Sequence, residues 1–207
     1  MTLKNIVEDS RFLRDRDEMM TYIQDKFYIP EETEIFHSPS RRFNLEIHHY
    51  YYEEGIRIYN YTKGIITDID NKIIDIIYRD YDPFLFCWVE MDGVEYLLCG
   101  IDYQGYSIVN LSKKETKHFV PEEAYVGSGF CWAEIMYFQH KKIIVVDGCY
   151  WACPYELVFY DFSNPMNVPY KELFRVEVDS ITNWDNWKDS CTVRYLDEEN
   201  NEKEYVF

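Results

Sequence analysis

The sequence predicts a mostly β fold made of repeated four-strand antiparallel units, preceded by a short helical segment. Three observations lead to this prediction. Aromatic residues, which favour strands, make up 18% of the chain and include 20 tyrosines. From residue 35 onward, short stretches of alternating apolar and polar residues are separated by turn residues. Finally, a five-residue motif at residues 86–90 returns almost unchanged at residues 130–134.

The first part of the chain differs from the rest. Its apolar residues from Phe12 to Phe27 are spaced for one face of a helix, and Pro30 is expected to end that helix. We therefore expect one or two short helices packed onto a sheet. This divides the chain into a helical appendage at residues 1–34 and a β-repeat domain at residues 35–207.

The repeat is the most informative feature of the β domain. The motif reads Phe-Cys-Trp-Val-Glu at residues 86–90 and Phe-Cys-Trp-Ala-Glu at residues 130–134. In each copy a turn, an apolar strand, an aromatic loop, a third strand and a weaker fourth strand follow in the same order. An earlier, degraded copy is expected before residue 80. Within it, strands are predicted at residues 43–52, 56–61, 64–69 and 72–78, and a tight turn at Asp70-Asn71.

Residues 184–207 are interpreted as a fragment of a fourth copy. Units of four short strands at this period are typical of propeller blades. Three or four units favour a small or incomplete β-propeller-like domain, or a twisted stack of sheets. The alternative is an ordinary sandwich or barrel in which two hairpins happen to be alike.

Two segments also resemble a group of uncharacterised bacterial β-propeller-like proteins. They are EYLLCGIDYQGY at residues 95–106 and GCYWACPYE at residues 148–156. The resemblance covers residues 36–170. It implies a propeller-like β fold and no known activity, and it supplies no catalytic residues.

The formal net charge is −17, from 38 acidic and 21 basic side chains. A negative field of this size repels phosphate groups, so binding to nucleic acid or to an anionic membrane is disfavoured. A basic protein surface would suit the charge. The alternative is that the charge only keeps the protein soluble.

The N-terminal residues are charged and lack the apolar core of a signal peptide, and no apolar run reaches the length of a membrane span. We therefore expect a cytoplasmic protein whose six cysteines are buried thiols. Three of them, Cys131, Cys149 and Cys153, could hold zinc if they converge. Without a second matching pair this is disfavoured, and neither a metal nor a cofactor is predicted.

Sequence motifs for catalysis are absent: there is no nucleophile elbow, no phosphate-binding glycine loop and no HExxH. His48 and His49 are neighbours on a predicted strand, so their side chains should point to opposite faces. Glu90 and Glu134 could form an acid–base pair. Their equivalent places in the repeat indicate a structural role instead, and we expect a protein without enzymatic activity.

The aromatic loops at residues 102–106 and 150–155 are the best candidates for a binding site. If the units are blades, the two loops are equivalent and emerge on the same face of the domain. The candidate partner-binding residues are Asp102, Tyr103, Gln104, Tyr106, Tyr150, Trp151, Tyr155 and Glu156. Exposed Tyr and Trp carry binding energy well, and acidic neighbours favour a cationic partner. The alternative is that these rings fold back over the edge of the core.

Together these features predict a non-enzymatic, acidic protein-binding module. An immunity protein or inhibitor that acts on a basic toxin or nuclease would fit the charge and size. One alternative is a small-ligand-binding protein or hydrolase that uses Glu90, Glu134 or Asp102 in a central pocket. Another is a structural subunit of a larger assembly.

Overall fold

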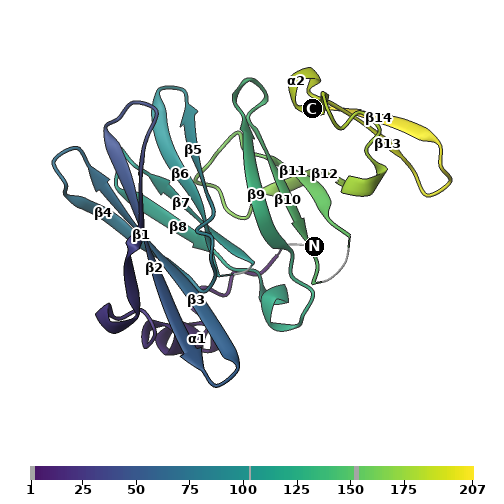
Figure 1. Ribbon diagram of the computed structural model, residues 1–207. Helices are drawn as coiled ribbons and strands as arrows, with labels where there is room; N and C mark the ends of the chain where they lie inside the picture. The colour runs from purple at the N-terminus through teal and green to yellow at the C-terminus, as the bar shows by residue number, and fades with distance from the viewer. Residues whose placement is uncertain (1–2, 103, 152–153) are drawn as a thin grey trace. The chain divides into compact units, whose positions relative to one another are not determined.

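A computed structural model describes residues 3–102, 104–151 and 154–207 of the chain. It divides into two compact units (Figure 1). The first unit comprises Met1–Gly129 and Pro165–Pro169, and the second comprises Phe130–Asn164 and Tyr170–Phe207. Each unit is described by itself below.

The first unit begins with helix α1 (Ser10–Met20), which starts where the Asp9 side chain accepts a hydrogen bond from the Arg11 amide at 2.9 Å. Phe12 and Met19 are the buried residues of this helix. The helix ends before the predicted stripe does. Phe27 lies in a separate short 3₁₀ turn, Asp25–Phe27.

Strand β1 (Tyr28–His37) follows at once, so it begins inside the range that the sequence analysis described as helical. β1 is an edge strand, and its pairing with β2 shifts register between Ile29 and Glu34. Pro30 lies in this irregular stretch. Proline is tolerated at an edge or a bulge because its missing N–H costs no central ladder bond.

The first sheet of this unit is an antiparallel meander, β1-β2-β3-β4. β2 (Phe43–Glu54) and β3 (Arg57–Asp68) pair along their whole length, and β4 (Ile73–Arg79) completes the sheet. The two strands predicted at residues 56–61 and 64–69 are therefore one strand. Gly64 does not break it, and a side chain there would collide with Phe84, whose Cζ lies 2.5 Å from the Cβ position. The predicted turn at Asn71 is present, with φ of 59°.

The second sheet of the first unit contains the first complete copy of the repeat. β5 (Phe86–Met91), β6 (Val94–Ile101), β7 (Gly105–Asn110) and β8 (Glu115–Phe119) again form a meander in chain order. The two sheets share one hydrophobic core. It is centred on side chains with no exposed surface, contributed by both sheets: Leu45, Ile66, Ile77, Leu97, Cys99 and Val109.

The second unit contains the second copy of the repeat. β9 (Cys131–Phe138), β10 (Ile143–Cys149), β11 (Glu156–Asp161) and β12 (Lys171–Glu177) form a sheet with neighbours in chain order. One face of this sheet is covered by the C-terminal segment. That segment consists of α2 (Trp187–Ser190), β13 (Thr192–Leu196) and β14 (Glu202–Val206). Its buried Trp187 and Val193 pack into one core with Val145 and Phe159.

The prediction of a mostly β fold with four-strand antiparallel units and a short N-terminal helix is confirmed. Both copies of the motif lie at the first strand of a four-stranded sheet. The interpretation of residues 184–207 as a fourth copy is not supported, because the segment forms one helical turn and a two-stranded hairpin. Three further 3₁₀ turns complete the described elements: Glu122–Tyr125, Gln139–Lys141 and Val178–Ser180.

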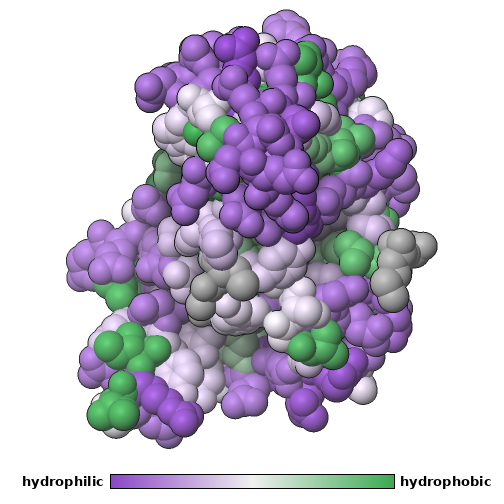
Figure 2. Space-filling view, turned by 90° about the vertical axis from the view of Figure 1, so that its right-hand side faces the viewer, coloured by the Kyte–Doolittle hydropathy of each residue, from purple (hydrophilic) through white to green (hydrophobic). Residues whose placement is uncertain are grey.

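One face of the molecule is largely hydrophilic (Figure 2). Figure 2 shows polar residues over most of the visible face, with hydrophobic residues in small, separate groups. Within the described parts of the chain, no helix is both long enough and apolar enough to cross a membrane.

Candidate functional site

The connection between β10 and β11 in the second unit carries four of the predicted binding residues. Tyr150 is half-buried, whereas Trp151 and Tyr155 expose 51% and 50% of their surface. Glu156 is the first residue of β11. The structure thus brings these four residues together on one connection, with two large rings facing solvent.

Arg175 of β12 joins the two ends of this connection, Tyr150 and Glu156. Its Nη1 donates hydrogen bonds to the hydroxyl of Tyr150 and to Oε2 of Glu156, each at 2.7 Å. Its Nη2 donates to Oε2 of Glu172 at 2.7 Å. The guanidinium also lies over the rings of Tyr150 and Phe130, 5.3 and 5.6 Å from their centroids. Hydrogen bonding to Glu172 raises the pKa of Arg175, so the charge that holds the loop is permanent.

The carboxylates around Arg175 outnumber it. Glu156 pairs directly opposite Glu177 across β11 and β12, and like charges in that relation repel each other. Arg175 bonds to Glu156 and Glu172, while Glu177 forms no ion pair within the described part of the chain. The surface beside the two exposed rings is therefore acidic and would favour a cationic partner.

The equivalent turn of the first unit, between β6 and β7, has a different character. Gln104 and Tyr106 are 5% and 4% exposed, and the Tyr106 ring lies 5.4 Å from that of Phe119. The Gln104 side chain packs against Gly129 and fills the space that a side chain at residue 129 would need. A Cβ added to Gly129 would lie 1.5 Å from Oε1 of Gln104. Tyr103 lies outside the described residues. At Gln104 and Tyr106 the side chains fold back onto the core, so they offer little surface to a partner.

Asp102 begins the same turn with φ of 53°, a left-handed conformation that Asp adopts more readily than most residues. Burial raises its pKa to about 6. The pKa of Asp80, which directly follows β4, is raised to about 7, first by burial and then by the negative charge of Asp102. The two residues therefore form a carboxyl pair that resists losing both protons.

Arg79 lies beside this pair and is only 3% exposed. Its guanidinium fits against Gly100, where a Cβ would lie 1.8 Å from Nη1. The sequence analysis identified Asp102 but missed Asp80 and Arg79. In the sequence, the one indication of this site is the charged pair Arg79-Asp80, which follows the apolar residues of β4.

Glu90 and Glu134, the other carboxylates considered for catalysis, are exposed on β5 and β9. They belong to different units, so neither unit brings them together. His48 and His49 contact different partners, as opposite orientations require: His48 lies against Tyr28 and Glu46, and His49 faces Glu34 and Asp82 at 3.4 Å.

The cysteines of the second unit come close but do not define a metal site. Cys131 and Cys149 are direct cross-strand neighbours on β9 and β10. Cys153, the third predicted zinc ligand, lies outside the described residues. Within the ranges that the structure describes, no group of three His, Cys, Asp or Glu side chains is placed to hold a metal ion.

Comparison with known proteins adds one relative. No known protein family matches the chain. An uncharacterized protein of Acanthamoeba polyphaga mimivirus is 35% identical over 157 residues. The similarity covers 73% of this chain but 61% of the viral protein, so the chain spans less than two thirds of its relative. The expected resemblance to a bacterial group was wrong, because the similarity found is to a viral protein.

Proposed function

We propose that this chain is a non-enzymatic, acidic protein-binding module that binds a basic protein through the β10–β11 connection of the second unit. The observation that carries the proposal is the exposure of Trp151 and Tyr155 on a connection fixed by Arg175. Trp and Tyr side chains have few rotatable bonds, so ordering them on binding costs little conformational entropy, and they are enriched among the residues that dominate interface energies.

The negative net charge of the chain is the reason for proposing a positively charged partner. The net charge of −17 would speed the encounter with a basic protein and would repel nucleic acids and anionic membranes. A narrower form of the proposal is an immunity protein or inhibitor of a basic toxin or nuclease, acting in the cytoplasm. It rests on the charge, the size and the lack of catalytic motifs.

We also infer that the repeated units are of the propeller-blade type. Each has four consecutive antiparallel strands, and the two sheets of the first unit share one core between their faces. This is the relation expected of neighbouring blades. An experimental structure in which these two sheets pack edge to edge would contradict the inference.

A pull-down from the native cell lysate at low and at high salt tests the proposed function. The bait would be the full chain, compared with a double variant, Trp151→Ala with Tyr155→Ala. We expect a basic protein that is retained at low salt, lost at high salt and lost by the double variant. Tyr51→Ala is the matched control, because it removes an exposed ring from the first unit. Retention of the same protein by the double variant would contradict the proposed site.

A second candidate function, small-ligand binding or hydrolysis by carboxylates, is favoured by the Asp80–Asp102 pair. Carboxyl groups with raised pKa values are a frequent property of ligand-binding and catalytic sites. Screening small ligands by their effect on melting temperature, with wild type and Asp102→Asn in parallel, tests this candidate. A ligand that stabilises the wild type alone would support it, and one that stabilises both proteins equally would count against it.

A further inference from the structure

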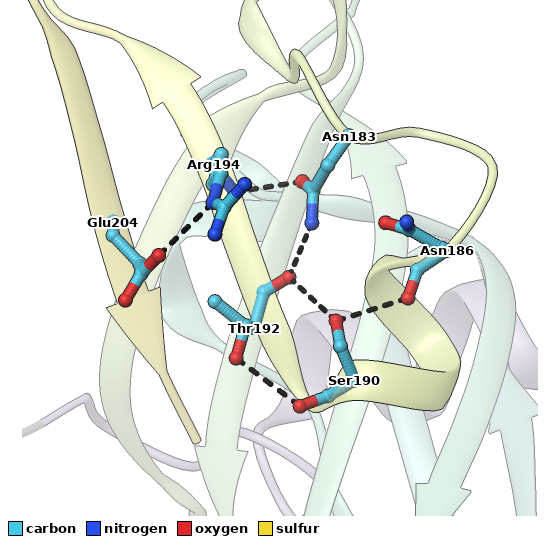
Figure 3. Close-up of a pocket in the computed structure, with 6 residues that line it drawn as sticks. All are labelled: Asn183, Asn186, Ser190, Thr192, Arg194 and Glu204. Carbon is cyan, nitrogen blue, oxygen red and sulfur yellow. Dashed lines mark hydrogen bonds and ion pairs between the residues drawn. The ribbon is translucent and has the colours of Figure 1, made fainter.

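The second unit contains a polar pocket, distinct from the loop proposed above. It lies between α2, the turn before it and the β13–β14 hairpin (Figure 3). Its volume is about 220 Å³. The six residues that line it are all polar: Asn183, Asn186, Ser190, Thr192, Arg194 and Glu204.

Hydrogen bonds within the wall hold this pocket in shape. Asn183 donates from Nδ2 to the carbonyl oxygen of Thr192 and accepts from the amide of Arg194, both at 2.7 Å. Ser190 donates from its hydroxyl to the carbonyl oxygen of Asn186 at 3.0 Å. Figure 3 shows these bonds as a chain across the pocket. A pocket held in this way needs little rearrangement to receive a ligand.

Several hydrogen-bonding groups in the wall have no partner among the residues that the structure describes. The side-chain amide of Asn186 bonds to none of the residues that the structure describes, so it offers a donor and an acceptor. Arg194 bonds to Glu204 through Nε at 3.0 Å, and its two terminal nitrogens bond to no described residue. The ion pair balances the charge of the lining. An ion therefore gains no net attraction there, whereas hydroxyl groups, which both donate and accept, match the wall.

A tryptophan stands on the same turn. Trp184 directly follows Asn183 and is 48% exposed, and its ring leans on the buried ring of Trp187 at 6.5 Å between centroids. An exposed indole ring offers a flat apolar surface beside polar groups. A sugar has the complementary form, with an apolar C–H face and a rim of hydroxyl groups.

We propose that this pocket binds a neutral sugar ring, with Asn186 and Arg194 bonding to its hydroxyl groups; Trp184 does not line the pocket but follows its wall residue Asn183 in the chain, and would meet the apolar face of the ring from the rim. The volume suits one ring and is below the range of about 300–1,000 Å³ that drug-sized ligands occupy. The ring can come from a free monosaccharide or from the end of a glycan, since both present the same hydroxyl groups.

Saturation-transfer difference NMR on the full chain tests the proposal. The probes are glucose, galactose, mannose and N-acetylglucosamine as methyl glycosides, and a glycan array then distinguishes a free sugar from a glycan terminus. We expect saturation transfer to at least one probe. Asn186→Ala should weaken binding about fivefold, the effect of about 1 kcal/mol from one lost hydrogen bond. Trp184→Ala should weaken it at least as much.

Asp185→Ala is the matched control, because Asp185 is exposed, lies between the two tested residues, does not line the pocket and carries no aromatic ring. The Asn186 side chain bonds to no residue in the described ranges, so its replacement should leave the melting temperature unchanged. No saturation transfer to any probe at millimolar concentration would overturn the proposal. Binding that both Asn186→Ala and Trp184→Ala leave intact would overturn it as well.

Discussion

At the scale of single residues, two charged side chains organise the candidate sites, and the sequence revealed neither. Arg175 gains its role from Tyr150 and Glu156, which the pairing of β11 with β12 brings to it, and from Glu172 on its own strand. Asp80 gains its raised pKa from burial and from Asp102, which lies in the turn that follows β6. Both effects depend on contacts between residues distant in the chain. The sequence analysis could name Asp102, Tyr150 and Glu156, but not what fixes them.

Replacing Arg175 by glutamine should lower the free energy of unfolding by about 1–3 kcal/mol, because partly buried acceptors lose their charged donor. Urea denaturation of wild type and variant measures the loss. Arg14→Gln is the matched control, since Arg14 is exposed and pairs only with the adjacent Asp15, and it should change stability by less than about 0.5 kcal/mol. Equal effects of the two changes would contradict the role assigned to Arg175.

Replacing Asp80 by asparagine should change how stability depends on pH. The folded protein holds a proton at Asp80 up to about pH 7, whereas the unfolded chain releases it near pH 4. Between these values the folded state binds more protons, so this group lowers stability as pH rises. At pH 8 the variant should be more stable than wild type by about 1–2 kcal/mol, after allowance for solvent screening.

Melting temperatures measured from pH 4 to pH 8 check this expectation. The difference between variant and wild type should grow across that range and be smallest at pH 4. Asp70→Asn makes the same substitution at an exposed position and is the control. A difference for Asp80→Asn that is constant with pH would contradict the burial of this carboxyl group.

At the scale of elements, the strand order of each repeat could be predicted because alternation and turn residues are local signals. The edge strand β1 could not be predicted, because Pro30 and the glutamates after it break the alternation that is typical of a strand. The C-terminal hairpin was read as part of a repeat because its strands alternate like the others. The polar pocket beside α2 was not predicted, because its wall joins residues 183–186 to residues 190–204 only after the hairpin folds.

A substitution at Gly148 tests how closely β9 and β10 pack in the second repeat. A Cβ at this position would lie 2.2 Å from the carbonyl oxygen of Cys131 on the neighbouring strand. The backbone cannot yield as a flexible side chain does, so Gly148→Ala should destabilise the protein by about 1–3 kcal/mol. Chemical denaturation measures the change. A variant as stable as wild type would show that β9 and β10 do not approach each other as described.

At the scale of the whole molecule, charge and two exposed rings suggest the same kind of partner. In the proposed complex, the net charge of −17 would act over distance and set the rate of encounter, whereas Trp151 and Tyr155 would act on contact and set the rate of dissociation. Composition alone predicted the first property. The exposed rings could be predicted only in part, because the two aromatic loops look equivalent in the sequence. In the structure, Gln104 and Tyr106 of the first loop are buried, whereas Trp151 and Tyr155 of the second are exposed.

The most direct test of the protein-binding account is a calorimetric titration of the captured basic protein with wild type, Trp151→Ala and Tyr51→Ala, each at two salt concentrations. The account predicts that Trp151→Ala weakens the affinity by about 2 kcal/mol, roughly thirtyfold, and that Tyr51→Ala leaves it unchanged. It also predicts that higher salt weakens binding of all three proteins. An affinity that is the same for wild type and Trp151→Ala, or insensitive to salt, would contradict it.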